Sequence, residues 1–72
     1  MDPYENLANA IIVQAAEDYR AALKRLKRDP QNKSARQTAQ EVEEFFRSGW
    51  FRVLTDADGG MILSRLKGEI EE

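Results

Sequence analysis

One run of apolar residues constrains the fold of this chain more than any other feature. Between residues 3 and 28, apolar side chains recur every three or four positions, which is the period of an α-helix. On a helical wheel they fill a stripe roughly 160° wide. A single packing partner covers less than that, so we expect one long helix that contacts two others. The stripe contains Tyr4, Leu7, Ala8, Ile11, Ile12, Ala15, Tyr19, Ala22, Leu23 and Leu26.

Local signals mark both ends of this helix. Asp2 suits the N-cap and Glu5 the third helical position, which is the pattern of a capping box. Pro30 ends the helix, because proline lacks a backbone donor and pushes the residue before it, Asp29, out of the α region. The helix is therefore expected over residues 3–28.

A second, narrower apolar stripe predicts a helix over residues 33–48. Asn32 or Ser34 can cap its start, and Gly49 its end. Because the connection to the first helix is short, the two helices should form an antiparallel hairpin. The width of this stripe suits one packing partner. Its members are Ala35, Ala39, Val42, Phe45 and Phe46.

Residues 50–54 are aromatic and β-branched, a composition that strands also favour. An isolated strand has no pairing partner here, so we expect a short helical turn that closes one end of the hairpin. A last helix is expected over residues 59–71, with Asp58 among its candidate caps. The predicted fold class is all-α: a helical hairpin, a short turn and a third helix, in a single domain over residues 1–72.

The segment from Asp56 to Gly60 invites comparison with a calcium-binding loop. An EF-hand loop needs Gly at position 6 and a bidentate Glu at position 12. Counting from Asp56 puts Met61 and Lys67 at those positions, and counting from Leu54 puts Arg65 at position 12. The segment is therefore predicted to be a turn before the last helix.

The composition excludes several classes of protein. The 72 residues include no cysteine and no histidine, so disulfides and the usual zinc sites are excluded, and we expect no cofactor. Histidine is also the commonest general base near neutral pH, so its absence argues against an enzyme. The chain has no apolar run of about 20 residues and no visible signal peptide, which predicts a cytoplasmic protein. A domain of this size is only marginally stable by itself. We therefore expect the chain to self-associate.

Aromatic side chains alternate with arginines between residues 45 and 52. Phe45 and Phe46 are expected in the core, because aromatic rings contribute most to burial. Trp50 and Phe51 fit either the core or a surface, and aromatic residues mixed with arginine are typical of interaction hot spots. The predicted interaction residues are Arg47, Trp50, Phe51 and Arg52, with Val13, which lies off the stripe of the first helix, as a contact across a homodimer.

Basic residues gather around the predicted bend between the first two helices. The helix dipole favours cations in a last turn, which explains much of the cluster without a ligand. The alternative is a phosphate-binding patch, since clustered Lys and Arg attract polyanions. A nucleic-acid or nucleotide binder is therefore the second functional hypothesis. Its phosphate-binding residues would be Arg20, Lys24, Arg25, Arg28, Lys33 and Arg36.

Three stretches carry a resemblance to known proteins: residues 4–12, residues 18–20, and residues 45–51 with the following Leu54 and Thr55. They are similar to a family of short helical proteins, with no assigned activity, from prophages and mobile elements of Gram-positive gut bacteria. The resemblance implies a context in which small helical proteins bind host proteins, defence systems included. The first functional hypothesis is therefore a non-catalytic interaction protein that binds a host or element-encoded protein, as an inhibitor of a host defence system.

Overall fold

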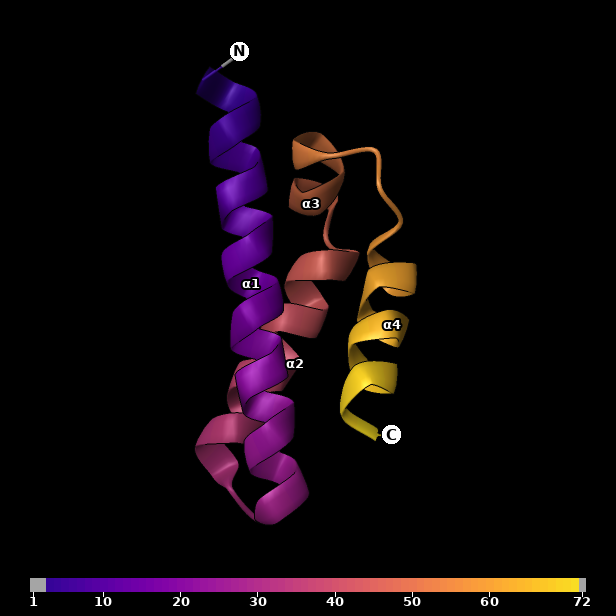
Figure 1. Cartoon of the computed structure of the whole chain (residues 1–72). Helices are drawn as coiled ribbons and strands as arrows, with labels where there is room; N and C mark the ends of the chain where they lie inside the picture. Colours follow the sequence, from indigo (N-terminus) through magenta and orange to yellow (C-terminus); the bar gives the residue numbers. More distant parts are fainter. Residues whose placement is uncertain (1–2, 72) are drawn as a thin grey trace.

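The computed structural model describes the backbone of residues 3–71 and the side chains of residues 7–70. This part of the chain contains helices and no strand, which confirms the predicted all-α class (Figure 1). The short helical turn expected at residues 50–54 is present as a helix that begins one residue earlier, and the capping box expected at Asp2 and Glu5 lies outside the described side chains. The helices are α1 (Pro3–Arg28), α2 (Lys33–Arg47), α3 (Gly49–Leu54) and α4 (Gly59–Glu71).

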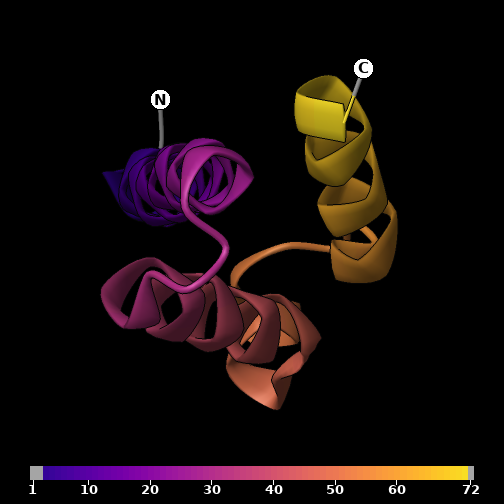
Figure 2. The same cartoon turned by 90° about the horizontal axis from the view of Figure 1, so that it is seen from below.

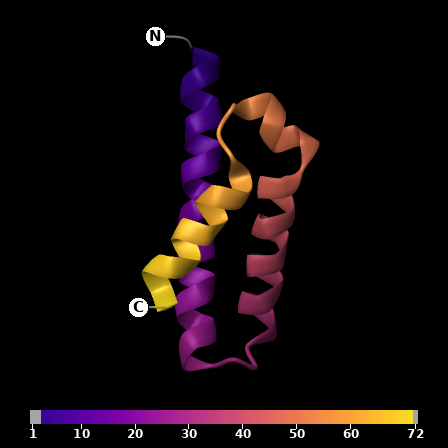
Figure 3. The same ribbon diagram turned by 90° about the vertical axis from the view of Figure 1, so that its right-hand side faces the viewer.

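Helices α1 and α2 form the antiparallel hairpin that their short connection predicts (Figure 3). Asn32 caps α2, because its side-chain oxygen accepts a hydrogen bond from the N–H of Ala35 at 3.0 Å. Of the two expected caps, Asn32 is therefore the one used, and Ser34 is not. The N–H of Asn32 also donates to the carbonyl oxygen of Asp29 at 3.1 Å, which closes the turn between the helices.

Helix α4 lies on one side of the hairpin and packs against both of its helices (Figure 2). Helix α1 therefore packs mainly against two helices, as the width of its apolar stripe predicts, and makes a smaller contact with α3. The prediction of a single partner for α2 is wrong, because α4 also packs against it. The close contact between α4 and α2 depends on Gly59, the first residue of α4. Gly59 lies against the carbonyl group of Phe46, with no space for a side chain.

The core lies between α1, α2 and α4, and α3 contributes one ring to it. Tyr19 is fully enclosed, and its hydroxyl donates a hydrogen bond to Oε2 of Glu43 at 2.9 Å. The same carboxylate oxygen lies 4.0 Å from Nζ of Lys67, so residues of three helices meet at Glu43. The buried apolar residues are Tyr19, Ala22, Ala35, Ala39, Val42, Phe46, Phe51, Leu63 and Leu66.

Helix α1 is longer than its partners, so part of its apolar stripe is uncovered. Its 26 residues span about 39 Å, close to the 41 Å length of the molecule, whereas the 15 residues of α2 span about 23 Å. Leu7 is 60% exposed and Ile11 is 37% exposed as a result. The stripe predicts that both side chains pack against another helix. This prediction is wrong for Leu7, and Ile11 is only partly covered.

Candidate protein-interaction site

A single serine connects α2 to α3. The N–H of Ser48 donates to the carbonyl oxygen of Phe45 at 3.1 Å, and the Ser48 hydroxyl donates to the same oxygen at 2.7 Å. The hydroxyl oxygen also accepts from the N–H of Phe51 at 3.3 Å, so Ser48 caps the end of α2 and the start of α3. The prediction that Gly49 caps α2 is wrong, because the serine satisfies the end of α2 and Gly49 already belongs to α3.

Phe51 anchors α3 to the core. Its side chain is 1% exposed, and its ring centroid lies 5.8 Å from that of Phe45 and 5.0 Å from that of Phe46. Tilted and edge-on contacts of this kind stabilise aromatic pairs beyond the area that they bury. Phe51 is therefore a core residue, and its assignment to the interaction surface is wrong. The expected core position is confirmed for Phe46, whereas Phe45 is half-buried.

The other side of α3 is exposed to solvent. Trp50 is 62% exposed, and Val53, three residues later on the same helix, is more exposed still. Helical residues three apart are neighbours, so these two apolar side chains form one patch. Sequence reasoning missed Val53, and the signal that identifies it is this spacing from Trp50. We name the surface made by Arg47, Trp50, Arg52 and Val53 the α3 corner.

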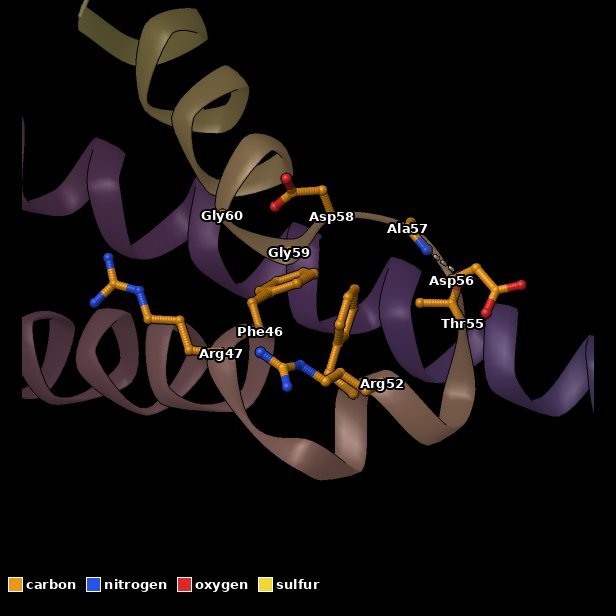
Figure 4. Close-up of a pocket in the computed structure, with 10 residues that line it drawn as sticks. Phe46, Arg47, Arg52, Thr55, Asp56, Ala57, Asp58, Gly59 and Gly60 are labelled. Atoms are coloured by element: carbon orange, nitrogen blue, oxygen red, sulfur yellow. Dashed lines mark hydrogen bonds between the residues drawn. The ribbon is translucent and has the colours of Figure 1, made fainter.

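Arg47 and Arg52 line an open cleft that Trp50 and Val53 do not line (Figure 4). The cleft has a volume of about 520 Å³ and lies between the end of α2, α3 and the loop that leads into α4. Among the side chains of residues 7–70, none forms a hydrogen bond or an ion pair with either guanidinium. Both arginines are therefore free to pair with acidic groups of a partner.

The loop on the other wall of the cleft is stabilised by its own polar groups. Oγ1 of Thr55 accepts a hydrogen bond from the N–H of Ala57 at 3.2 Å, and Oδ1 of Asp58 accepts one from the N–H of Met61 at 3.2 Å. Asp58 thus acts as a cap at the start of α4, which was among the expected roles for it. The structure has a bend at residues 56 and 57, so the predicted turn is shorter than expected, and Gly59 and Gly60 already belong to α4.

Val13 is exposed on α1, as predicted, but it does not line the cleft beside the α3 corner. The structure therefore brings Arg47 and Arg52 to one cleft, and neither Trp50 nor Val13 lines that cleft. The expected contact of Val13 across a homodimer is separate from the α3 corner.

Two of the six basic residues expected to bind phosphate are engaged in other contacts. Nε of Arg20 donates to Oε2 of Glu69 at 2.9 Å, and Nη2 of Arg36 donates to the carbonyl oxygen of Pro30 at 2.8 Å. The ion pair with Glu69 offsets the charge of Arg20, whereas the bond to Pro30 occupies one donor of Arg36 and leaves its charge unchanged. Four of the six are exposed and have no bonded side-chain partner among the described residues: Lys24, Arg25, Arg28 and Lys33.

The pair of Arg20 and Glu69 ties the end of α4 to the middle of α1. A second contact joins Nη2 of Arg20 to Oε1 of Glu69 at 3.4 Å. The hydrogen bond from Arg20 lowers the pKa of the Glu69 carboxyl, and the same bond raises the pKa of the Arg20 guanidinium. Both side chains are largely exposed, so the pair orients α4 more than it stabilises the fold.

Two features are absent from the described part of the chain: a metal-binding cluster and a membrane-spanning helix. Within residues 7–70, no cluster of three or more acidic side chains is arranged to hold a metal ion. No helix in the described part of the chain has both the length and the apolar content that crossing a bilayer requires. No protein-family model, curated protein or solved structure matches this chain. The geometry of the α3 corner is therefore the basis for a functional proposal.

Proposed function

We propose that this chain is a non-catalytic interaction protein that binds another protein through the α3 corner. One observation carries the proposal: Trp50 is 62% exposed on a helix that Ser48 and Phe51 hold in place. Tryptophan and arginine are enriched at binding hot spots, and here Trp50 lies two residues before Arg52 and three residues after Arg47 in the chain. An aromatic side chain on a held helix loses little conformational entropy when it binds.

The proposed partner is a host or element-encoded protein in the cytoplasm of a bacterial host. The support is the resemblance to proteins of prophages and mobile elements, in which small helical chains bind host proteins. In that setting, binding inhibits a host defence system by covering a surface that the defence protein needs. Such inhibition requires a complementary surface and no catalytic group.

Affinity capture from a lysate of a Gram-positive gut bacterium tests the proposal. The wild-type chain is compared with Trp50→Ser/Val53→Ser, and the matched control is Met61→Ser, which alters a residue of similar exposure (56%) on α4. We expect one protein to be retained by the wild type and the control and to be lost with the double variant. Equal capture by all three chains contradicts the proposal. Loss of protection against a defence system, with the same ranking of variants, tests the inhibitory role.

A homodimer is part of the same proposal. Its support is the apolar surface left uncovered on α1, where Leu7, Ile11 and Val13 are all exposed. Light scattering at several protein concentrations measures the mass directly. A chain that stays monomeric at the highest concentration contradicts the dimer, and an unchanged dimer in Val13→Lys excludes Val13 as its contact.

The second candidate function is nucleic-acid or nucleotide binding at the bend between α1 and α2. It rests on the four exposed basic residues that have no bonded partner there: Lys24, Arg25, Arg28 and Lys33. Such binding should weaken steeply between low and moderate salt, because cations on phosphates release counterions. A gel-shift titration without a retarded band removes this candidate.

A further inference from the structure

The hairpin has a second side that α4 does not cover. On α1, Arg20 and Lys27 bond to α4, whereas Ile11 and Asp18 fall on the opposite flank of the helix by their spacing. An open groove of about 450 Å³ lies between α1 and α2 on this flank, and no residue of α4 lines it. Figure 2 shows α4 on one side of the two hairpin helices, with the other side bare.

The floor of this groove is apolar. Ile11 and Ala15 contribute from α1, and Val42 and Phe45 contribute from α2. Phe45 is only half-buried although it touches two other rings, because its outer face lies in the groove. Leu7 lies one turn before Ile11 and extends the apolar surface along α1.

The rim of the groove is acidic. The charged residues that line it are Asp18 and Glu41. Gln14 donates to Asp18 at 3.0 Å and Gln37 donates to Glu41 at 3.1 Å, so a neighbouring amide orients each carboxylate. Within residues 7–70, no cation forms an ion pair with either carboxylate. An occupant of the groove should therefore carry apolar side chains flanked by cations.

The α3 corner of this same chain has that chemistry. Trp50 and Val53 supply the apolar side chains, and Arg47 and Arg52 supply two guanidinium groups without bonded partners among the described residues. Arginine pairs with carboxylates in a bidentate geometry, which makes it suited to the rim of such a groove. Apolar character and charge are therefore complementary between two regions of one chain.

We propose that the groove holds the α3 corner of a second copy of this chain. The groove and the α3 corner are neighbours, since Phe45 precedes Arg47 by two residues. A two-fold axis then allows each copy to place its α3 corner in the groove of the other, which gives two equal contacts and a closed dimer. The inference rests on the proposed function in one respect, because the same surface would bind the partner protein once the dimer separates.

A charge-exchange experiment tests the pairing. Asp18→Lys/Glu41→Lys reverses the rim of the groove, and Arg47→Glu/Arg52→Glu reverses the α3 corner. We expect each double variant alone to have a dimer dissociation constant at least tenfold above that of the wild type, measured by analytical ultracentrifugation. An equimolar mixture of the two variants should recover a complex with the mass of two chains, because the reversed groove accepts the reversed corner.

The matched control is Glu17→Lys/Glu44→Lys, which makes the same change in charge on α1 and α2 at residues that do not line the groove. This variant should dimerise like the wild type and should not recover association when mixed with Arg47→Glu/Arg52→Glu. Recovery by the control shows that net charge alone drives association and overturns the pairing. A monomeric wild-type chain, or a mass that rises beyond two chains, also overturns it.

The apolar part of the contact has its own variants. Ile11→Ser and Trp50→Ser should each raise the dissociation constant at least tenfold, whereas Met61→Ser should leave it within about twofold. Circular dichroism checks that each variant keeps its helical fold. If the chain does not dimerise and Trp50→Ser still abolishes capture of a host protein, this inference and the proposed homodimer fail, and the proposed binding of a partner protein through the α3 corner stands.

Discussion

Gly59 lies directly against the carbonyl oxygen of Phe46, with no space for a side chain between them. The contact joins the first turn of α4 to the last turn of α2. The Phe51 ring closes the same space from the side, at 3.2 Å from where a Cβ of residue 59 would lie. The position of α4 on the hairpin thus depends on a residue that has no side chain.

Gly59→Ala should therefore destabilise the fold by about 1–3 kcal/mol, because overpacking forces one helix to move. Gly68→Ala is the matched control, since nothing lies within 4 Å of a Cβ there. Alanine at that exposed helical position should raise the free energy of unfolding by about 0.5–1 kcal/mol. Urea unfolding followed by circular dichroism measures both, and a Gly59→Ala variant as stable as the wild type contradicts the prediction.

Truncation of two adjacent residues of α3 should change the free energy of unfolding by very different amounts. Phe51→Ala should cost about 3–5 kcal/mol, because it empties a fully enclosed site between two other rings. Trp50→Ala should change the free energy of unfolding by no more than about 0.5 kcal/mol, since its side chain is exposed. Thermal unfolding of both variants at one pH is the measurement. Similar losses for the two would mean that Trp50 supports the fold.

The hydroxyl of Tyr19 should contribute to stability apart from its ring. Tyr19→Phe keeps the enclosed ring and removes the hydrogen bond to Glu43, so we expect a loss of about 1–2 kcal/mol. Glu43→Gln keeps an acceptor for the hydroxyl and should cost less. Denaturant unfolding of the two variants ranks these effects, and the reverse order would show that the charge of Glu43 matters more than the hydroxyl.

The ion pair between Arg20 and Glu69 should make stability depend on pH in acid. Because folding lowers the pKa of Glu69 below its ordinary value near 4.5, the pair stabilises the fold above that pH. The stabilisation is lost as the pH falls through the lowered pKa. Thermal midpoints of the wild type and Glu69→Gln should therefore differ at neutral pH and converge in acid. Added salt should also reduce the difference, since both side chains are exposed.

The cap of α2 gives a further comparison. Asn32→Ala should cost about 1 kcal/mol, because it removes the acceptor for the N–H of Ala35. Ser34→Ala should have little effect, since Ser34 is exposed within the first turn and does not cap the helix. Chemical denaturation compares the two. Equal losses would show that the serine shares the capping role.

The helices could be predicted from the sequence because their ends depend on nearby residues. Pro30 ends α1, Asn32 starts α2 and Asp58 starts α4, each through its own backbone or side chain. The packing of α4 against α2 could not be predicted in the same way. It depends on the contact between Gly59 and Phe46, and those residues become neighbours only when the chain folds.

The candidate site could be predicted only in part, for a similar reason. Composition alone does not show which of Trp50 and Phe51 is buried and which is exposed, since both are large aromatic residues. The side of α3 on which each ring lies depends on where the helix starts. Ser48 determines that start, because it caps the end of α2 and the beginning of α3. A helix of 6 residues is also too short for hydrophobic periodicity to show its buried face, so Val53 was not identified.

The exposure of Trp50 has a practical consequence, because it is the one tryptophan in the chain. Its indole emission comes from the α3 corner alone, while the core reports through Tyr19 and the phenylalanines. A blue shift of that emission on mixing would mark the moment when the indole leaves water, without any attached dye. The protein thus carries an intrinsic optical probe at the surface where we expect it to meet its partners.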